Sequence, residues 1–106
     1  MSVQEIIASL RERVAANPSK IASLNASYQF NLTGEDGGTY HASFANGTHD
    51  IGEGPAAAAN CTVTMSANDF ISLVAGKLNP TTAFMTGKLK IAGDMSLALK
   101  LQNVLS

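Results

Sequence analysis

The 106-residue chain has no tryptophan, a single cysteine and charged residues at only 14% of its positions. One cysteine excludes an internal disulfide and fits a reducing compartment. The net charge of −1 argues against nucleic acid as a partner, because nucleic-acid binding usually needs a basic face. No apolar run is long enough to cross a bilayer, and the charged N-terminal segment lacks the apolar core of a signal peptide. These absences predict a cytoplasmic location.

Motifs for catalysis and cofactor binding are also missing. The chain has no Gly-x-Ser-x-Gly elbow, no dinucleotide fingerprint and no phosphate-binding loop. The two histidines, His41 and His49, show no metal-site spacing to each other, to Cys61 or to the acidic residues, and a metal site needs three or four converging groups. Cys61 alternates in phase with Val63 and Met65, as a small buried hydrophobe does. We therefore expect a protein that is not an enzyme and uses neither a metal nor a cofactor.

Hydrophobic residues make up 45% of the chain, whose length fits one domain over residues 1–106. The first segment predicts a helix: apolar residues recur at helical spacing over 3–14, behind a capping-box pattern at Ser2–Glu5. Asn17-Pro18 should end this helix, because the residue before proline is pushed out of helical conformation. Two shorter helices should begin after the capping residues Ser66 and Asn79.

Between the helices the apolar period changes to two, which is typical of strands with one buried face. The predicted strands cover residues 26–33, 40–44, 48–52, 60–65 and 88–92. The glycine-rich segment 34–38 and the pair Asn46-Gly47 are turn signals, so the first three strands should form an antiparallel meander. The connection from Gly54 to Ala59 matches no element.

The last segment has more apolar surface than one packing interface requires. Asp94 should cap a helix in which one stripe combines Leu97, Ala98, Leu101, Val104 and Leu105. Met95 and Leu99 form a second patch on the same helix. A small domain can cover one stripe with its own sheet, so the second patch must meet something else, and an apolar ligand is one candidate.

The segment Gly87–Gln102, GKLKIAGDMSLALKLQ, closely resembles the signature of the sterol carrier protein-2 (SCP2) lipid-transfer domain. The segments Asn60–Met65 and Gly76–Gly87 are similar to that family too. The close match spans about 60–105, and before it only the order of elements agrees. Asn is usual at position 94, but Asp can make the same cap. The resemblance implies an intracellular, non-enzymatic carrier of fatty acids, fatty acyl-CoA, sterols or phospholipids.

Together, the pattern and the resemblance predict an α/β domain of the α+β type, with a five-stranded, mainly antiparallel sheet. Helices should cover one face and enclose an apolar tunnel between the two layers. The candidate ligand-binding residues are the large apolar side chains expected to face this tunnel. They are Leu10, Val14, Phe30, Phe44, Met65, Phe70, Val74, Phe84, Met85, Leu97, Leu101 and Leu105.

Two other interpretations stay open. The second apolar patch of the last helix could bury against a partner chain or a second copy, although we expect a monomer. The chain could also be a lipid-presenting domain derived from a larger peroxisomal enzyme, although its C-terminus lacks a Ser-Lys-Leu address. From Gly76 onward four lysines stand against Asp94 alone. This asymmetry predicts a transient contact with an anionic membrane surface.

Overall fold

The computed structural model describes residues 2–22 and 24–105, with side chains described up to Leu101. The described elements, in chain order, are α1 (Val3–Ala16), the 3-10 turn η1 (Pro18–Lys20), β1 (Ala26–Thr33), β2 (Gly38–Ala45), β3 (Thr48–Glu53), β4 (Cys61–Ser66), α2 (Ala67–Val74), α3 (Pro80–Met85), β5 (Leu89–Gly93) and α4 (Met95–Leu105). Every helix and strand predicted from the sequence is present, and the strand limits agree within two residues.

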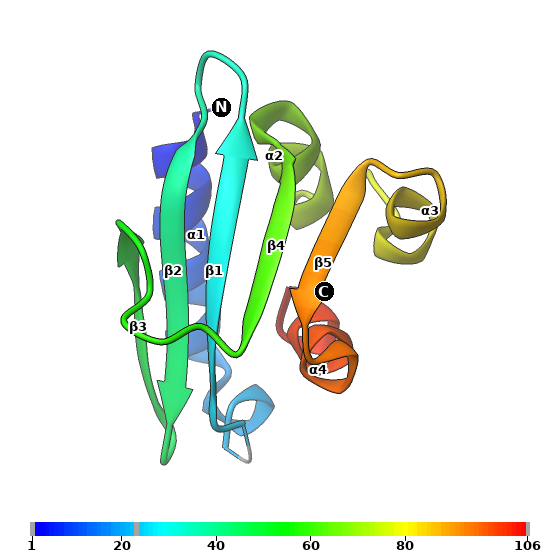
Figure 1. Ribbon diagram of the computed structural model, residues 1–106. Coiled ribbons are helices and arrows are strands. Elements are labelled where there is room, and N and C mark those ends of the chain that lie inside the picture. Colours follow the sequence, from blue (N-terminus) through cyan, green and yellow to red (C-terminus); the bar gives the residue numbers. More distant parts are fainter. Residues whose placement is uncertain (1, 23, 106) are drawn as a thin grey trace.

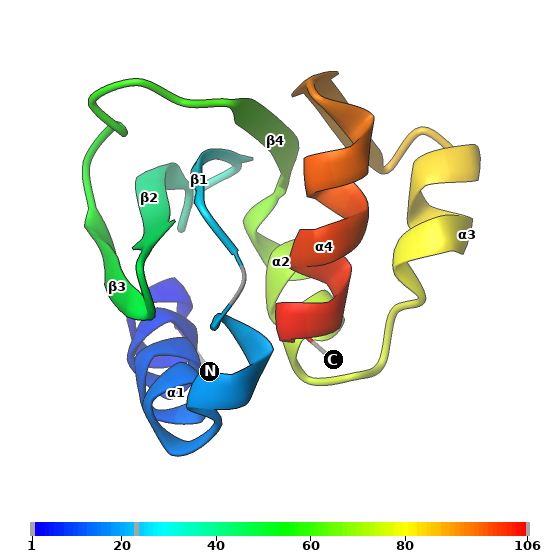
Figure 2. The same ribbon diagram turned by 90° about the horizontal axis from the view of Figure 1, so that it is seen from below.

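The five strands form one sheet in the order β3-β2-β1-β4-β5. Neighbouring strands are antiparallel except β1 and β4, which run parallel. Helices α1, α2 and α4 lie on one face of the sheet, and α3 lies beyond its β5 edge (Figures 1 and 2). The predicted fold class, a mainly antiparallel five-stranded sheet with helices on one face, is confirmed.

The parallel pair follows from the connection between β3 and β4, for which the sequence pattern predicted no helix or strand. This segment crosses from the outer side of the meander to the far side of β1 (Figure 1). Asn60 secures its end, because its main-chain N–H donates to Ser27 O at 2.8 Å and its side-chain Oδ1 accepts from Ser27 N at 2.9 Å. From there β4 can only run alongside β1 in the same direction.

Polar side chains cap the helices where the sequence predicted. Ser2 and Glu5 form the complete capping box of α1. Ser66 Oγ accepts from Asp69 N at 3.1 Å at the start of α2. Asn79 Oδ1 accepts from two main-chain N–H groups of α3. Each bond satisfies an N–H that has no partner within its own helix, so these residues fix where the helices begin.

Helix α4 is joined to the sheet by a buried hydroxyl group. Tyr28 of β1 is fully buried, and its phenolic O–H donates to the main-chain oxygen of Leu97 at 2.7 Å. Burial raises the pKa of Tyr28 to about 12, and the nearby Cys61 and Asp94 add to the shift. The neutral phenol therefore ties the first turns of α4 to the centre of the sheet.

Tyr28→Phe should lower the free energy of unfolding by about 1 kcal/mol at pH 8, the usual net contribution of one hydrogen bond. In the unfolded chain Tyr28 ionises near pH 10, and in the folded chain near pH 12. The stability that this group contributes is thus complete below pH 10 and is lost as the pH rises toward 12. Urea unfolding of both proteins at pH 8 to 11.5 should show the wild type losing its advantage. If the difference in unfolding free energy between the wild type and Tyr28→Phe does not change with pH, Tyr28 is not a buried, neutral phenol.

Strand β5 approaches the start of β4 at a glycine. Gly93 has a φ of +108°, and a Cβ there would collide with Asn60 O and lie 3.1 Å from Cys61 Cα. Both are main-chain atoms, so they cannot move aside as a flexible side chain does. Gly87, at the other end of β5, has a φ of +79° but open space around the Cβ position.

These two glycines allow a matched test. Gly87→Ala should cost about 1–2 kcal/mol, the price of a left-handed non-glycine residue. Gly93→Ala adds a collision with the main chain, so we expect a loss of more than about 3 kcal/mol or failure to fold. Chemical denaturation of the two variants measures the difference. Equal losses would mean that the β4–β5 contact is looser than described.

Candidate functional site

An apolar cavity of about 250 Å³ lies between the sheet and helices α3 and α4. Its walls come from strands β1, β4 and β5 and from helices α2, α3 and α4, and among the described lining residues only Thr81 has a polar side chain. The lining residues are Phe30, Val63, Leu73, Pro80, Thr81, Phe84, Leu89, Ile91, Met95, Ala98, Leu99 and Leu101. Three of them, Phe84, Met95 and Leu99, are also exposed to solvent. The cavity therefore opens to the surface between α3 and α4.

A second, much narrower space of about 10 Å³ lies deeper, between α1 and the first three strands. It is lined by Ile7, Leu10, Val14, Phe30, Ala42, Phe44, Ile51 and Leu101. Phe30 and Leu101 belong to the walls of both spaces. These two side chains therefore form the partition between the open cavity and the deep space.

The residues predicted to bind ligand lie in different places. Phe30, Phe84 and Leu101 line the apolar cavity. The deep space is lined by Leu10, Val14 and Phe44, and also by Phe30 and Leu101. Met65 and Phe70 are buried in the core without lining either space, and Leu97 is half-buried against the core. Val74 lines a separate pocket described below. Met85 is instead 80% exposed, and the side chain of Leu105 lies outside the described residues.

Met85 lies on the surface for a geometric reason. It is the last residue of α3, a helix of six residues, and Ala83 is the buried member of that helix. A helix this short can turn only one narrow face toward the protein. Phe70, in contrast, supports the cavity from behind, because its ring lies 5.5 Å from that of Phe30 in a tilted arrangement.

Four of the cavity-lining residues absent from the predicted set carried a readable signal in the sequence. Leu89 and Ile91 alternate with lysines in β5, and Met95 and Leu99 form the second patch of the last helix. All four line the cavity. What the sequence did not show is that β5 lies at the sheet edge, where residues of α3 and α4 line one cavity with it.

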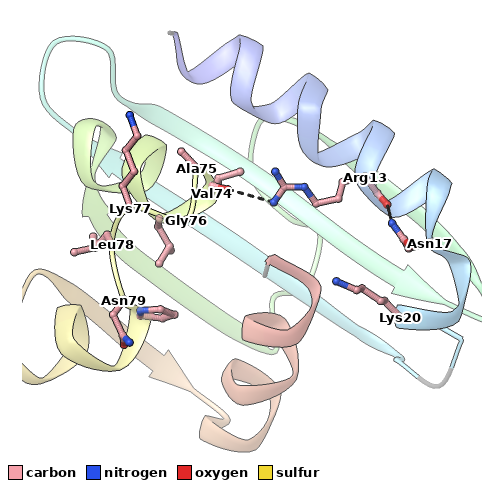
Figure 3. A pocket seen from close by; sticks show the side chains of 11 residues that line it. Arg13, Asn17, Lys20, Val74, Ala75, Gly76, Lys77, Leu78 and Asn79 are labelled. Carbon is pink, nitrogen blue, oxygen red and sulfur yellow. Dashed lines mark hydrogen bonds between the residues drawn. The ribbon is translucent and has the colours of Figure 1, made fainter.

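A basic pocket of about 790 Å³ adjoins the apolar cavity, and the two share Leu73 and Pro80 in their walls. It lies between the end of α1 and the α2–α3 connection (Figure 3). Among the described residues its charged lining side chains are Arg13, Lys20 and Lys77, and none of the lining residues described is acidic. The pocket is therefore an electropositive recess beside an apolar one.

The cationic side chains of this pocket differ in their contacts and in the direction in which they point. Arg13 Nη1 donates to Val74 O at 3.2 Å, which joins α1 to the end of α2. The Lys20 side chain extends from η1 toward the space between α1 and α4, whereas that of Lys77 points away from it (Figure 3). Arg13 and Lys20 thus form the positive wall on the α1 side.

The described residues contain neither an assembled metal site nor a membrane-spanning helix. Within 2–22 and 24–101 no three His, Cys, Asp or Glu side chains come together as metal ligands. Cys61 is buried, as predicted, and burial together with the charge of Asp94 raises the pKa of its thiol. No described helix combines the length and hydrophobicity needed to cross a bilayer.

The fold and the cavity define a class of small α+β domains that enclose an apolar space between one sheet and its covering helices. The chain belongs to the SCP-2 sterol transfer family, whose family model matches residues 7–106. The resemblance identified from the sequence is confirmed, and it extends over the N-terminal half, where only the order of elements was similar.

Solved structures of sterol carrier proteins have the same fold as this chain. A crystal structure of sterol carrier protein 2-like 2 from Aedes aegypti is 27% identical, with a TM-score of 0.79 over 98% of this chain and 96% of that one. The palmitated form of that protein, solved by NMR, is 28% identical, with a TM-score of 0.80 over 99% and 95%. Apo sterol carrier protein 2 from Yarrowia lipolytica is 30% identical, with a TM-score of 0.74 over 94% and 86%.

Curated relatives are longer proteins. Hydroxysteroid dehydrogenase-like protein 2 of Xenopus laevis is 44% identical over 92 residues, which are 86% of this chain and 22% of the relative. The human protein of that name is 41% identical over 87 residues, 81% of this chain and 21% of the relative. The chain thus spans about a fifth of the length of these relatives.

Proposed function

We propose that this chain binds and transfers a long-chain lipid, with the hydrocarbon chain in the apolar cavity and its polar head in the basic pocket. The observation that carries the proposal is the cavity between the sheet, α3 and α4, whose lining is apolar apart from Thr81. Burying a lipid chain there releases water from both surfaces, at about 0.8 kcal/mol for each buried methylene. The related Aedes aegypti protein that carries palmitate supports a fatty acid as one such ligand.

The shape of the cavity favours a flexible chain over a rigid ring system. A volume of about 250 Å³ is slightly below the usual range of ligand pockets, about 300–1,000 Å³. A longer guest has to pass the Phe30–Leu101 partition into the deep space. An acyl chain can thread a narrow passage by bond rotation, whereas a sterol has to open it widely. Fatty acids, acyl-CoA and phospholipids therefore fit better than sterols.

The charges beside the cavity favour an anionic head. A carboxylate or phosphate in the basic pocket would meet Arg13 and Lys20, and the described lining residues include no acidic one. The two spaces share Leu73 and Pro80, so one amphiphilic molecule can reach both. Charge-assisted hydrogen bonds of this kind are about twice as strong as neutral ones.

Filling the cavity tests where the chain binds. Ala98 is a half-buried lining residue of α4, and Ala98→Phe places a ring in the space that the lipid would take. Palmitate affinity should fall about tenfold or more, while the unfolding free energy stays level or rises, since filling a void restores lost contacts. Displacement of a fluorescent fatty acid and urea unfolding measure the two quantities. Ser96→Phe, on the exposed side of the same helix, is the matched control. Undiminished palmitate binding by Ala98→Phe would remove the chain from this cavity.

Reversing one charge tests where the head binds. Lys20→Glu should weaken palmitate binding about tenfold, by replacing an attraction with a repulsion. The binding of uncharged methyl palmitate should change less than about twofold. Lys90→Glu alters the net charge equally but lies on β5, outside both pocket linings, so it should leave both ligands unaffected. Equal losses for palmitate and its methyl ester would place the head group elsewhere.

The curated relatives favour a second candidate role. Because the chain matches about a fifth of each dehydrogenase-like protein, the same domain can serve as the lipid-holding part of a larger polypeptide. In that role the domain would present its lipid to a neighbouring catalytic domain. Adding the free chain to a dehydrogenase-like relative that lacks its own matching segment, and measuring turnover of a long-chain substrate, tests this role.

A further inference from the structure

The large apolar side chains that are exposed in the described part of the chain gather on two neighbouring helices. They are Phe84 (44% exposed) and Met85 (80%) on α3, and Met95 (45%) and Leu99 (64%) on α4. Helix α3 precedes β5 and α4 follows it, at opposite ends of the strand (Figure 1), and residues of both helices line the same apolar cavity. We call these four residues the α3–α4 apolar patch. Scattered apolar residues on a surface are ordinary, but a cluster at one place marks an interaction surface.

The patch coincides with the mouth of the apolar cavity. Phe84, Met95 and Leu99 line the cavity and are exposed as well, whereas Met85 is exposed without lining it. A molecule that leaves the cavity through this mouth passes across the patch. The surface that covers the patch is therefore the surface that delivers or receives the ligand.

Basic residues dominate this part of the chain. Over residues 76–101 there are four lysines and one acidic residue, whereas the preceding residues carry three basic and seven acidic ones. Lys88 lies three residues after the end of α3 and Lys100 follows Leu99 in α4, and both are exposed. Asp94, the acidic exception, accepts hydrogen bonds from the side chain and main chain of Ser96, which lower its pKa and hold it at the start of α4.

We propose that the α3–α4 apolar patch docks on an anionic lipid bilayer, with Lys88 and Lys100 at the head groups and Met85 and Leu99 inserted among the acyl chains. Each lysine near such a surface contributes about a fivefold gain in partition, from roughly 1 kcal/mol. A second copy of the chain fits the patch less well, because pairing two such surfaces would bring their lysines together. The proposal rests on the proposed function, since docking here puts the cavity mouth against the bilayer.

The absence of tryptophan from the chain provides a clean reporter. In Met85→Trp the indole is the only one present, and its emission should shift to shorter wavelength with vesicles of phosphatidylcholine and phosphatidylserine. Pure phosphatidylcholine vesicles should bind at least about tenfold more weakly. Glu35→Trp, in the acidic turn between β1 and β2, should show no shift with either vesicle.

Charge reversal within the reporter protein tests the lysines. Lys88→Glu with Lys100→Glu should lower the affinity for the anionic vesicles about tenfold or more. Lys77→Glu with Lys90→Glu changes the net charge equally and should have a clearly smaller effect. Equal effects of the two pairs, or an equal shift of Glu35→Trp, would overturn the assignment of this face. So would a blue shift that appears without vesicles and grows with protein concentration, because it would show self-association.

Palmitate binding without vesicles separates this proposal from the previous one. Met85 lines neither space, so Met85→Trp should bind palmitate within about twofold of the wild type. If the wild type binds no lipid but the reporter still enters anionic vesicles, the carrier function fails and the docking face stands. If lipid is bound but the reporter stays in water, the docking face is wrong and the carrier function stands.

Discussion

The structure depends on one imbalance: helix α4 has apolar side chains on more of its circumference than the sheet can cover. Leu101 is buried and Leu97 is half-buried against the core, which satisfies one stripe. Met95 and Leu99 point elsewhere and remain exposed. The Tyr28 hydroxyl donates to Leu97 O, and this bond favours the orientation of α4 that leaves its second side uncovered. The cavity beside α4 is the consequence.

Such a cavity has an energetic cost, which explains why its mouth is open. At about 24 cal/mol per Å³, an empty and sealed void of about 250 Å³ would cost on the order of 6 kcal/mol. A typical domain has a total stability of only about 5–15 kcal/mol. An open mouth between α3 and α4 allows solvent or a ligand to occupy part of the space. A lipid that fills it restores the missing contacts and should stabilise the fold through binding alone.

Much of the fold could be predicted from the sequence because its signals are local. Capping residues such as Ser66 and Asn79 act within one helical turn, and the alternation of β1 or β4 is visible in six residues. The candidate site was harder to predict from the sequence, because it joins segments that are distant along the chain. The partition, for example, pairs Phe30 with Leu101, and neither pattern shows that the two will meet. The exposure of Met85 depends on the short length of α3, which the methionine itself does not reveal.

The basic pocket shows a further limit of reading each helix by itself. On α1, Arg13 lies beside the apolar stripe and could be taken for an ordinary solvent-facing residue. In the fold its guanidinium reaches Val74 O, sixty-one residues away, and becomes one wall of a pocket. The crossover to β4 makes this possible, because it brings α2 alongside α1 on the same face of the sheet. The parallel β1–β4 pair therefore does more than complete the sheet: it sets the charged recess next to the apolar one, as an amphiphilic ligand requires.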